Sequence, residues 1–376
     1  MPRVMRTPRT IEIDITNRCN LRCEYCYHFS SEGDVASDLP TDEWLAFFDE
    51  LGRSSVMEVT LGGGEPFVRE DITELIDGIV RNRMRYSVLS NGTLITEDQA
   101  AFLAGTRRCN HIQVSIDGSA PEVHESCRGA GTFRRAVHAI EVLQAHGVPV
   151  AVRVTVHHRN VRDLPNIARF LLDDLGLPSF STNAASYLGL CRDHSAGIAL
   201  TVEDRVLAMT TLESLNERYG GRIQAAAGPL AEVRMWREMV RKTAEGSAMG
   251  DCAGGCLSSC GGVFSKLAVR ADGVYIPCTL LPGTVLGRIT VDDLADLWSN
   301  HPELERLRTR QTLPLAGFEE CGGCDYIPYC RGGCPGLSYT LTGSPYRPSP
   351  DACLRRFLRE SGLGPGSFLA GNGVTP

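Results

Sequence analysis

The sequence has no long apolar segment and no excess of basic residues. Nowhere among its 376 residues do 18 apolar residues stand together, which excludes a membrane-spanning helix. The start, MPRVMRTPRT, carries three arginines, but no apolar run follows them, so we expect no secretion signal. A net charge of −7, with lysine and arginine scattered along the chain, leaves no basic stripe for nucleic acid. We therefore expect a cytoplasmic protein with neither membrane nor nucleic-acid partners.

Cysteine, in contrast, is abundant, with 15 residues. In a long chain without a secretion signal the thiols stay reduced, so clustered cysteines are first interpreted as metal ligands. Cys109, Cys127 and Cys191 stand apart, and we interpret them as small buried apolar residues without a function. The grouped cysteines are Cys19, Cys23 and Cys26; Cys252, Cys256 and Cys260; Cys278; Cys321, Cys324, Cys330 and Cys334; and Cys353.

Up to about residue 190, short β-branched runs alternate with helical patterns, which is typical of parallel βα units. A chain that is 43% hydrophobic can bury such an α/β barrel beside a smaller second domain. Six units, two short of a closed eightfold barrel, predict a partial (β/α)6 TIM-like barrel with a wide side opening. The predicted strands are 11–16, 56–61, 86–90, 111–116, 148–156 and 180–186.

Several helices have readable ends. Thr96 starts a capping box, and Thr132 precedes an apolar helical face that Gly147 closes. Two further helices are predicted to begin near Thr201 and near Pro229, because proline suits a first helical turn.

Changes in composition mark the domain boundaries. We assign residues 1–200 to the partial barrel and 201–250 to a helical connector that ends in the linker TAEGSAMGD. Beyond it, glycines and cysteines multiply and regular periodicity fades, so we expect residues 251–358 to form a small domain that relies on metal for its fold. Residues 359–376, which end in GPGSFLAGNGVTP, are predicted to be a flexible tail.

Polar and glycine-rich residues fall at the ends of the predicted strands. The cysteine loop follows the first strand, GGGEP (62–66) the second and SNG (90–92) the third, while Ser115 lies on the fourth. Each is ordinary loop chemistry when taken alone. Because the C-terminal ends of parallel strands meet on one rim, together they predict a pocket.

The loop TNRCNLRCEYCYH offers three thiols with no fourth nearby. A structural zinc site needs four ligands, and His28 could complete one. Three thiolates on a four-iron cluster instead leave one iron free to bind a substrate or cofactor, and that vacancy is useful to an enzyme.

The spacing Cys19-x3-Cys23-x2-Cys26, with aromatic Tyr25 before the last cysteine, resembles the signature of the radical S-adenosylmethionine (radical SAM) family. GGEP at the second strand end and the six-unit partial barrel also resemble this family, and the resemblance covers roughly residues 10–190. It implies a cluster whose open iron binds SAM. One electron would then split SAM into methionine and a 5′-deoxyadenosyl radical that abstracts hydrogen from an unactivated carbon.

The same resemblance implies which residues contact SAM. Gly63 and Gly64 allow close approach of the backbone because they lack side chains, and Glu65 offers an anionic acceptor for the ammonium group. Tyr25 would lie near adenine. Arg128 could pair with the carboxylate, although an exposed, solvated arginine is the alternative. Hydroxyl and amide groups suited to the ribose complete the set, namely Ser90, Asn91 and Ser115.

After residue 250 the cysteines follow a longer pattern. A zinc ribbon built on residues 321–334 is one interpretation, but it leaves Cys260, Cys278 and Cys353 unexplained. The order and spacing resemble the seven-cysteine motif of the SPASM branch of the radical SAM family. The pattern is Cys260-x12-Gly273-x4-Cys278, then Cys321-x2-Cys324-x5-Cys330-x3-Cys334, then Cys353.

This second resemblance implies two auxiliary four-iron clusters, three clusters in all. A cysteine upstream of Cys260 would be the fourth ligand of the first auxiliary cluster, and we favour Cys256 over Cys252 because its spacing suits a compact loop. All-cysteine ligation would suit electron transfer and net oxidation of the substrate. The implied ligands are Cys256, Cys260, Cys278 and Cys334 for the first cluster, and Cys321, Cys324, Cys330 and Cys353 for the second.

The sequence says less about the substrate. Sulfatase maturases of this branch carry an aspartate after the cysteine that matches Cys278, and Thr279 at that place disfavours this subfamily. Many peptide maturases have an N-terminal domain that binds a leader peptide. Here the first strand begins by about residue 11, so we expect a separate leader-binding protein, or the barrel itself, to take that role.

The main hypothesis is oxidative modification, by crosslinking or other dehydrogenation, of a ribosomally synthesised precursor peptide, with an electron donor such as flavodoxin or ferredoxin. The alternative is a dehydrogenase or epimerase of a small natural product such as an aminoglycoside. A zinc-stapled binding protein without catalysis is a third hypothesis. No catalytic acid or base is identified, and the residues that could point inward are Glu12, Asp14, Arg153, His157 and Tyr187.

Overall fold

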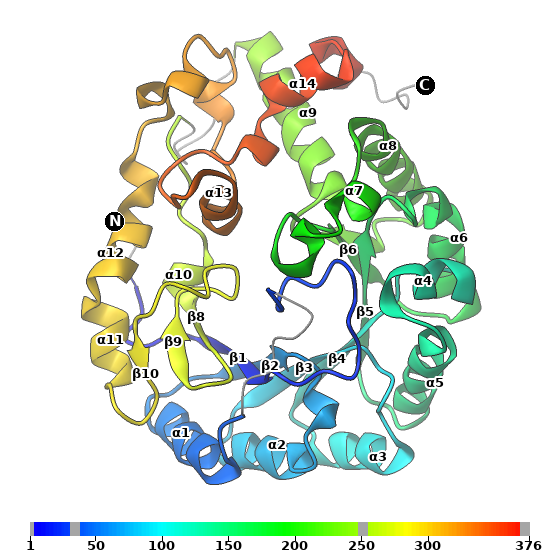
Figure 1. Cartoon of the computed structure of the whole chain (residues 1–376), viewed down its shortest axis with the longest axis vertical. Helices are drawn as coiled ribbons and strands as arrows, with labels where there is room; N and C mark the ends of the chain where they lie inside the picture. The colour runs from blue at the N-terminus through cyan, green and yellow to red at the C-terminus, as the bar shows by residue number, and fades with distance from the viewer. Residues whose placement is uncertain (1–3, 31–37, 247–254, 369–376) are drawn as a thin grey trace.

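A curved sheet of ten strands organises the computed structural model, which describes residues 4–30, 38–246 and 255–368. The strand order is β10-β9-β8-β1-β2-β3-β4-β5-β6-β7, and neighbouring strands from β8 through β1 to β7 are parallel. Figure 1 shows the curvature of this sheet, with helices on its outer side. The architecture is the predicted partial barrel.

All six predicted strands are present, and each boundary lies within two residues of its expected place. The β-branched residues that predicted them pack well on a pleated surface covered by helices. The observed strands are β1 (Thr10–Thr16), β2 (Glu58–Gly63), β3 (Arg85–Ser90), β4 (Cys109–Ser115), β5 (Val150–Val156) and β6 (Phe180–Ala184).

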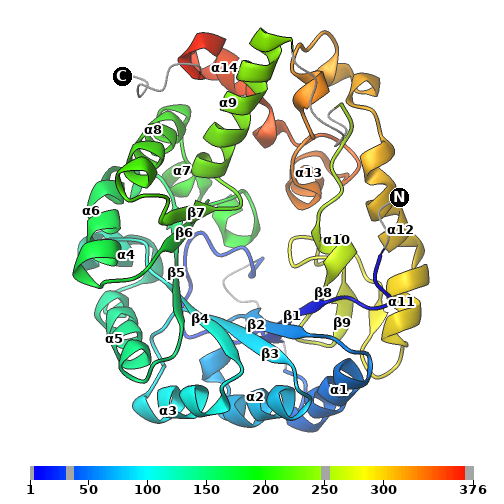
Figure 2. The ribbon, with the colours of Figure 1, turned by 180° about the vertical axis from the view of Figure 1, so that it is seen from behind.

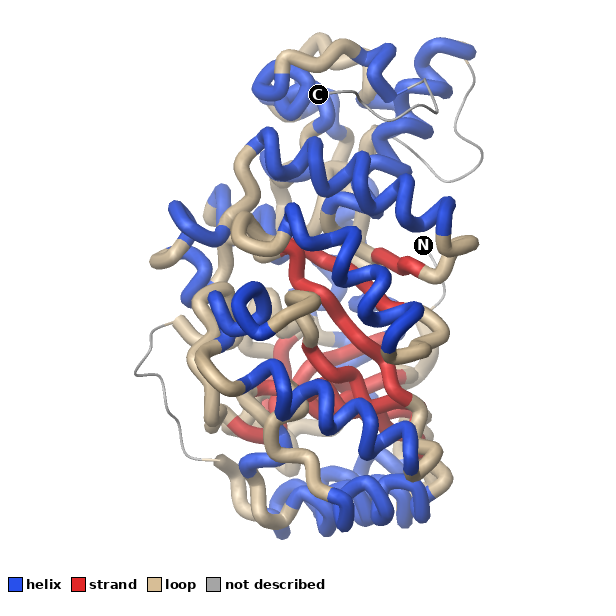
Figure 3. Tube along the Cα trace, turned by 90° about the vertical axis from the view of Figure 1, so that its right-hand side faces the viewer, coloured by secondary structure: helices blue, strands red, loops and turns tan. Residues whose placement is uncertain are grey.

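Helices cover the outer face of the sheet, as the views from behind and from the side show (Figures 2 and 3). Thr96 carries the expected capping box, and helices begin at Thr132, directly after Thr201 and at Pro229 as predicted. The helices are α1 (Thr41–Arg53), α2 (Ile72–Arg81), α3 (Glu97–Thr106), α4 (Pro121–Arg128), α5 (Thr132–Ala145), α6 (Leu164–Arg169), α7 (Ser195–Ile198), α8 (Val202–Arg218) and α9 (Pro229–Glu245).

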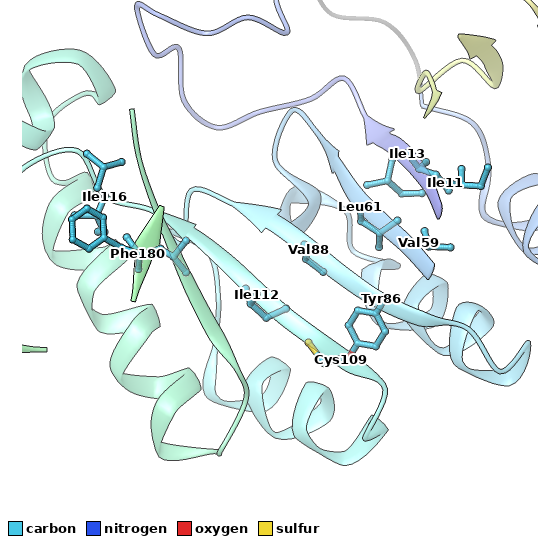
Figure 4. Packing of buried hydrophobic residues seen from close by; sticks show 14 of the residues in the cluster. Ile11, Ile13, Val59, Leu61, Tyr86, Val88, Cys109, Ile112, Ile116 and Phe180 are labelled. Carbon is cyan, nitrogen blue, oxygen red and sulfur yellow. The ribbon is translucent and has the colours of Figure 1, made fainter. Parts of the chain in front are cut away.

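The core lies between the sheet and these helices. Figure 4 shows Ile11, Leu61, Val88 and Ile112 from four adjacent strands on this face, and all four side chains are fully buried. Because side chains alternate along a strand, the residues between them face the concave side. There the side chains are mostly polar, for example Glu12, Thr60, Ser87, His111 and Ser115. The concave face can therefore bind polar groups.

The second half of the chain extends the sheet at both ends, which the sequence did not predict. β7 (Ile223–Ala225) pairs with β6, and β8 (Lys266–Val269) pairs with β1. β9 (Val274–Ile276) and β10 (Gly287–Arg288) then add antiparallel pairs. Strands of two to four residues are too short for a readable periodicity. Further helices in this half are α10 (Gly262–Ser265), α11 (Leu294–Asn300), α12 (Pro302–Thr309), α13 (Pro335–Thr342) and α14 (Leu354–Ser361).

The observed elements also differ from the expected tail and linker. α14 runs to Ser361 and a 3-10 turn spans Pro365–Phe368, so the segment expected to be flexible contains regular structure. α9 continues to Glu245 and so includes the first three residues of the expected linker, and residues 247–251 lie outside the described part of the chain. Among the helices that the structure describes, none combines the length and apolar character that a membrane span requires.

Candidate functional site

Three thiols gather in the loop that follows β1. Cys19, Cys23 and Cys26 are half-buried and none forms a disulfide. Burial, together with the neighbouring thiols of Cys26 and Cys19, raises the pKa of Cys23 to about 12 against the lowering effect of Arg128. The predicted trio is therefore brought together. When these thiols are deprotonated, the neighbouring thiolates repel one another. A bound metal cluster would neutralise their charge.

The geometry of this loop fits a cluster better than a single zinc ion. His28, the alternative fourth ligand, has Nε2 at 2.9 Å from Asn17 Oδ1 and Nδ1 at 3.7 Å from Asp14 Oδ2, so both ring nitrogens face oxygen atoms. Across the described residues, no three His, Cys, Asp or Glu side chains converge closely enough to hold one metal ion. A four-iron cluster spreads its ligands over separate irons, which suits the trio.

The glycine-rich turn after β2 positions the start of the cysteine loop. The Gly64 amide donates to the Thr16 carbonyl at 2.8 Å, and the Glu65 amide donates to the Arg18 carbonyl at 2.9 Å. A Cβ on Gly64 would lie 2.1 Å from the Arg18 oxygen, and Gly63 has a φ of +103°. These two positions therefore require glycine because the backbone of the cysteine loop packs against them, a requirement that the sequence did not suggest.

Glu65 joins the ends of β2 and β3. Its Oε1 accepts hydrogen bonds from the Ser90 hydroxyl at 2.8 Å and the Phe67 amide at 3.2 Å, while Oε2 accepts one from the Asn91 amide at 2.7 Å. Burial raises the pKa of Glu65 to about 7 against the lowering effect of these donors. A carboxylate can accept about four hydrogen bonds, so three of its positions are occupied within the protein.

The three residues assigned to the ribose differ in their surroundings. The Ser90 hydroxyl donates to Glu65. The side-chain nitrogen of Asn91, Nδ2, lies 3.0 Å from Asn20 Oδ1 and 4.0 Å from Cys19 Sγ. Ser115 is half-buried at the end of β4, and its hydroxyl has no hydrogen-bond partner among the described residues. Its hydroxyl is therefore the one still available for a ligand.

Arg128 is buried, which overturns the alternative of an exposed, solvated arginine. Its Nε lies 2.5 Å from Asp117 Oδ2, and one terminal nitrogen lies 4.0 Å from Cys23 Sγ. Asp117 is fully buried and also accepts hydrogen bonds from the Thr155 amide at 2.7 Å and from the Tyr25 hydroxyl. Burial raises the pKa of Asp117, but the Arg128 charge and nearby histidines hold it below its usual value overall.

Sequence reasoning missed Asp117, although it directly follows the predicted strand 111–116. Its position at the rim where the other site residues were expected was the available signal. Asp117 links the cysteine loop, β5 and α4 through its three partners. It is thus a positioning residue for the first cysteine site.

The five residues that could point inward lie in different surroundings. Glu12 pairs with Lys266 at 2.9 Å, and Asp14 lies beside His28. His157 is buried and stacks on Tyr25 with ring centroids 5.6 Å apart, and burial lowers its pKa to about 4. The remaining two are Arg153, exposed on the concave face of β5, and Tyr187, exposed in the loop after β6. The three isolated cysteines are buried as predicted, namely Cys109, Cys127 and Cys191.

A second set of thiols surrounds a cavity of about 190 Å³ beside β8. Cys260, Cys278 and Cys334 line it, and burial together with the two neighbouring thiols raises the pKa of Cys278 to about 11. A thiol-lined cavity of this kind fits a cluster. Cys256 is not among the described residues that line it, and Cys252 lies outside the described part of the chain. The choice of fourth ligand stays a prediction.

The third set comprises the remaining cysteines of the C-terminal pattern. Burial and the charges of Cys330, Cys353 and Cys324 raise the pKa of Cys321 to about 11, so these four thiols are neighbours. Cys334 instead lies with the second set. This grouping contradicts the zinc ribbon, which required Cys321, Cys324, Cys330 and Cys334 at one metal.

Comparison with known proteins decides the family. The model of the radical SAM superfamily matches residues 13–171. The chain belongs to this superfamily. A second model, described as an iron-sulfur cluster-binding domain and named SPASM, matches residues 260–325. This radical SAM protein is therefore an enzyme of the SPASM branch that binds SAM and iron–sulfur clusters and cleaves SAM reductively, and the hypothesis of a non-catalytic zinc protein is wrong.

Relatives of this radical SAM enzyme match nearly the whole chain. It is 28% identical to the AdoMet-dependent heme synthase of Methanosarcina barkeri (strain Fusaro / DSM 804), over 93% of this chain and 97% of that protein. It is 29% identical to the mycofactocin maturase MftC of Mycobacterium ulcerans (strain Agy99), over 93% and 89%. It is 26% identical to the PqqA peptide cyclase of Granulibacter bethesdensis (strain ATCC BAA-1260 / CGDNIH1), over 89% and 84%.

Solved structures share the fold of this radical SAM enzyme. Streptococcus suis SuiB bound to S-adenosylmethionine superposes with a TM-score of 0.70 at 16% identity, covering 93% of this chain and 78% of SuiB. Native anSMEcpe with bound AdoMet superposes with a TM-score of 0.68 at 18% identity, covering 94% and 96%. The similarity extends through both halves of the chain, in keeping with a sheet to which both halves contribute strands.

Proposed function

We propose that this enzyme oxidatively modifies a ribosomally synthesised precursor peptide, by crosslinking or by other dehydrogenation. The observation that carries the proposal is structural: the first cysteine trio follows β1 and the second thiol set lies beside β8, the strand next to β1 in a sheet whose concave face is polar. Such an arrangement can take a substrate electron as well as a hydrogen atom. The relatives named as a mycofactocin maturase and a PqqA peptide cyclase support a peptide as substrate.

A small-molecule substrate is the second candidate. The relative named as a heme synthase matches this chain over a greater share of its own length than the two peptide enzymes do. The name of that relative, and not the extent of the match, is what makes a non-peptide substrate the second candidate. The alternative of a dehydrogenase or epimerase acting on a small natural product is kept for this reason.

We assign three four-iron clusters to the three thiol sets. When bound and reduced, the first supplies the electron that splits SAM and so yields the radical that abstracts hydrogen. The loop that would hold the first cluster is fixed to the barrel by hydrogen bonds from the Gly64 and Glu65 amides. The ligands that we propose are Cys19, Cys23 and Cys26; Cys256, Cys260, Cys278 and Cys334; and Cys321, Cys324, Cys330 and Cys353.

The SAM contacts are likewise proposed from position. The Ser115 hydroxyl is available for a ribose oxygen, and Arg128, beside Cys23, is available for the SAM carboxylate through the nitrogens that Asp117 does not occupy. Tyr25 is held by Asp117 and would orient the adenine. The other contacts in this proposal are Gly63, Gly64, Glu65, Ser90 and Asn91.

The partners are also part of the proposal. An electron donor such as flavodoxin or ferredoxin would reduce the clusters, and a separate protein or the barrel would hold the leader peptide. A cytoplasmic location follows from the reducing conditions that free cysteine ligands require.

Iron analysis and two variants test the assignment. Anaerobically reconstituted protein should hold about twelve irons, since each cluster contains four. Cys23→Ala should lose about four irons and all SAM cleavage, because one of three ligands is absent. Cys353→Ala should keep SAM cleavage but stop turnover of substrate. Zinc in place of iron, or cleavage of SAM by Cys23→Ala, would contradict the assignment.

The substrate class needs its own experiment. The reconstituted enzyme is incubated with SAM, dithionite and a short peptide encoded beside its gene. The mass of the peptide is then measured by mass spectrometry. Loss of two hydrogen atoms that depends on SAM supports oxidative peptide modification. An unchanged peptide, with turnover of a porphyrin or a sugar instead, would establish the second candidate.

A further inference from the structure

Arg153 faces the concave side of the barrel. On β5, Val152, Val154 and Val156 are fully buried in the core between the sheet and the helices. Since side chains alternate along a strand, Arg153 must point the other way, and its side chain is exposed. A charged group is thus presented on the inner wall, where the polar side chains lie.

The neighbours of Arg153 place it close to the first cysteine site. In the sheet it pairs with Ser115 on β4 and with Ser181 on β6, both half-buried. Ser115 ends its strand two residues before Asp117, which bonds Arg128 and Tyr25. Arg153 is therefore the strand neighbour of Ser115, one of the groups assigned to SAM, on the same wall.

The charge of Arg153 also acts on the wall around it. Burial lowers the pKa of His111 on β4, and the Arg153 charge lowers it further. Its strand neighbours Ser115 and Ser181 are uncharged, and the Ser181 hydroxyl donates to the Val152 carbonyl at 3.3 Å, so no carboxylate stands beside the guanidinium in the sheet. This part of the wall is complementary to an anion.

Other charged groups on this face have partners, but Arg153 has none. Glu12 pairs with Lys266 at 2.9 Å, and Asp14 lies 3.7 Å from His28. No hydrogen bond or ion pair joins the Arg153 guanidinium to any residue that the structure describes. A cation without a counter-ion in a concave site attracts anions, and the planar guanidinium suits a carboxylate through two parallel hydrogen bonds.

We propose that Arg153 binds a carboxylate group of the substrate and so selects an acidic peptide. This inference rests on the proposed function, because it assigns a chemical class to the peptide at the same site. SAM carries a carboxylate as well, but Arg128 lies closer to the first thiol trio, 4.0 Å from Cys23 Sγ. Arg153 is a specificity-determining residue in this scheme.

Selection from a random peptide library tests the inference without a known substrate. Reconstituted holoenzyme with SAM is immobilised, and short random peptides that remain bound are sequenced. Wild-type enzyme should enrich peptides with Asp, Glu or a free C-terminal carboxylate. Arg153→Glu should lower that enrichment about tenfold, which is the loss expected for one charged hydrogen-bonded contact, and should enrich Lys and Arg instead.

Matched variants control for net charge and for folding. Arg134 is exposed on α5, on the outer side of the barrel, so Arg134→Glu makes the same change of charge away from the wall. This variant should keep the acidic preference. Arg153→Lys retains the charge but loses the two-pronged geometry, so its preference should be weaker yet still acidic. If Arg153→Glu fails to incorporate iron, Arg153→Gln replaces it and should show no charge preference.

Four other results would each contradict the inference, and one of them would contradict the proposed function as well. Acidic enrichment that survives Arg153→Glu or Arg153→Gln overturns the inference. If the Arg153 variants bind SAM with a tenfold higher dissociation constant but enrich the same peptides, Arg153 binds the SAM carboxylate and the inference is wrong. Peptides enriched by wild type without any charge preference leave the proposed function standing and remove only the inference. No enrichment at all removes the peptide function and the inference together.

Discussion

Replacement of Asp117 by asparagine should destabilise the enzyme by about 3 kcal/mol, the lower end of the range for breaking a buried ion pair. Asp117 is fully buried, and its Oδ2 lies 2.5 Å from Nε of Arg128, which is only 7% exposed. Asparagine keeps the size and one carbonyl oxygen, so the Thr155 amide can still donate. The Arg128 charge, however, is left buried without a counter-ion.

The assay is urea-induced unfolding of the reconstituted enzyme under anaerobic conditions at pH 7. The low pKa of Asp117 in the folded chain means that its contribution is complete at this pH, and is lost only as the pH falls through that pKa. Arg128→Met and the double variant complete a double-mutant cycle. Because both charges are absent in the double variant, its cost should be well below the sum of the two single costs.

The same cycle can refute the reasoning. If the two single costs add to within about 0.5 kcal/mol in the double variant, the pair is not the source of stability. SAM cleavage gives a second readout, since Asp117 also holds the Tyr25 hydroxyl. Asp117→Asn should slow cleavage, and an unchanged rate would show that Tyr25 does not depend on this bond.

Two further predictions concern the turn after β2. Gly64→Ala should cost the enzyme about four irons per chain, since a Cβ there would lie 2.1 Å from the Arg18 oxygen and displace the cysteine loop; Gly105→Ala, in open space on α3, is the control and should keep all of its iron. Full iron content in Gly64→Ala would disprove the steric argument. The raised pKa of Glu65, about 7 in the folded chain, means that the unfolding free energy falls as the pH rises toward 7, by about 2 kcal/mol between pH 5.5 and 8. Urea unfolding of Glu65→Gln should lack this part of the pH dependence, and an identical pH profile in both proteins would rule it out.

Local patterns determined much of this protein. The β-branched runs predicted six strands, because hydrophobic alternation reports which side of a strand is buried, and short stretches of chain carry that signal. The trio Cys19, Cys23 and Cys26 needed no distant contact, since eight consecutive residues of one loop hold all three. The resemblance of the cysteines after residue 250 to the SPASM motif implied two interleaved thiol sets, and the structure groups Cys260, Cys278 and Cys334 in one and Cys321, Cys324, Cys330 and Cys353 in the other.

Contacts between residues far apart in the chain were decided by the tertiary structure alone. Nothing near Arg128 in sequence indicates that it is buried, because its partner Asp117 is reached only after α4 folds back onto the barrel. The pairing of β8 with β1 joins residues about 250 positions apart, and no local pattern encodes that register. Arg153 was one of several candidates until the fold showed which charged neighbours are paired and which is not. A sequence determines which groups are available, whereas their counter-ions, burial and distance exist only once the chain has packed.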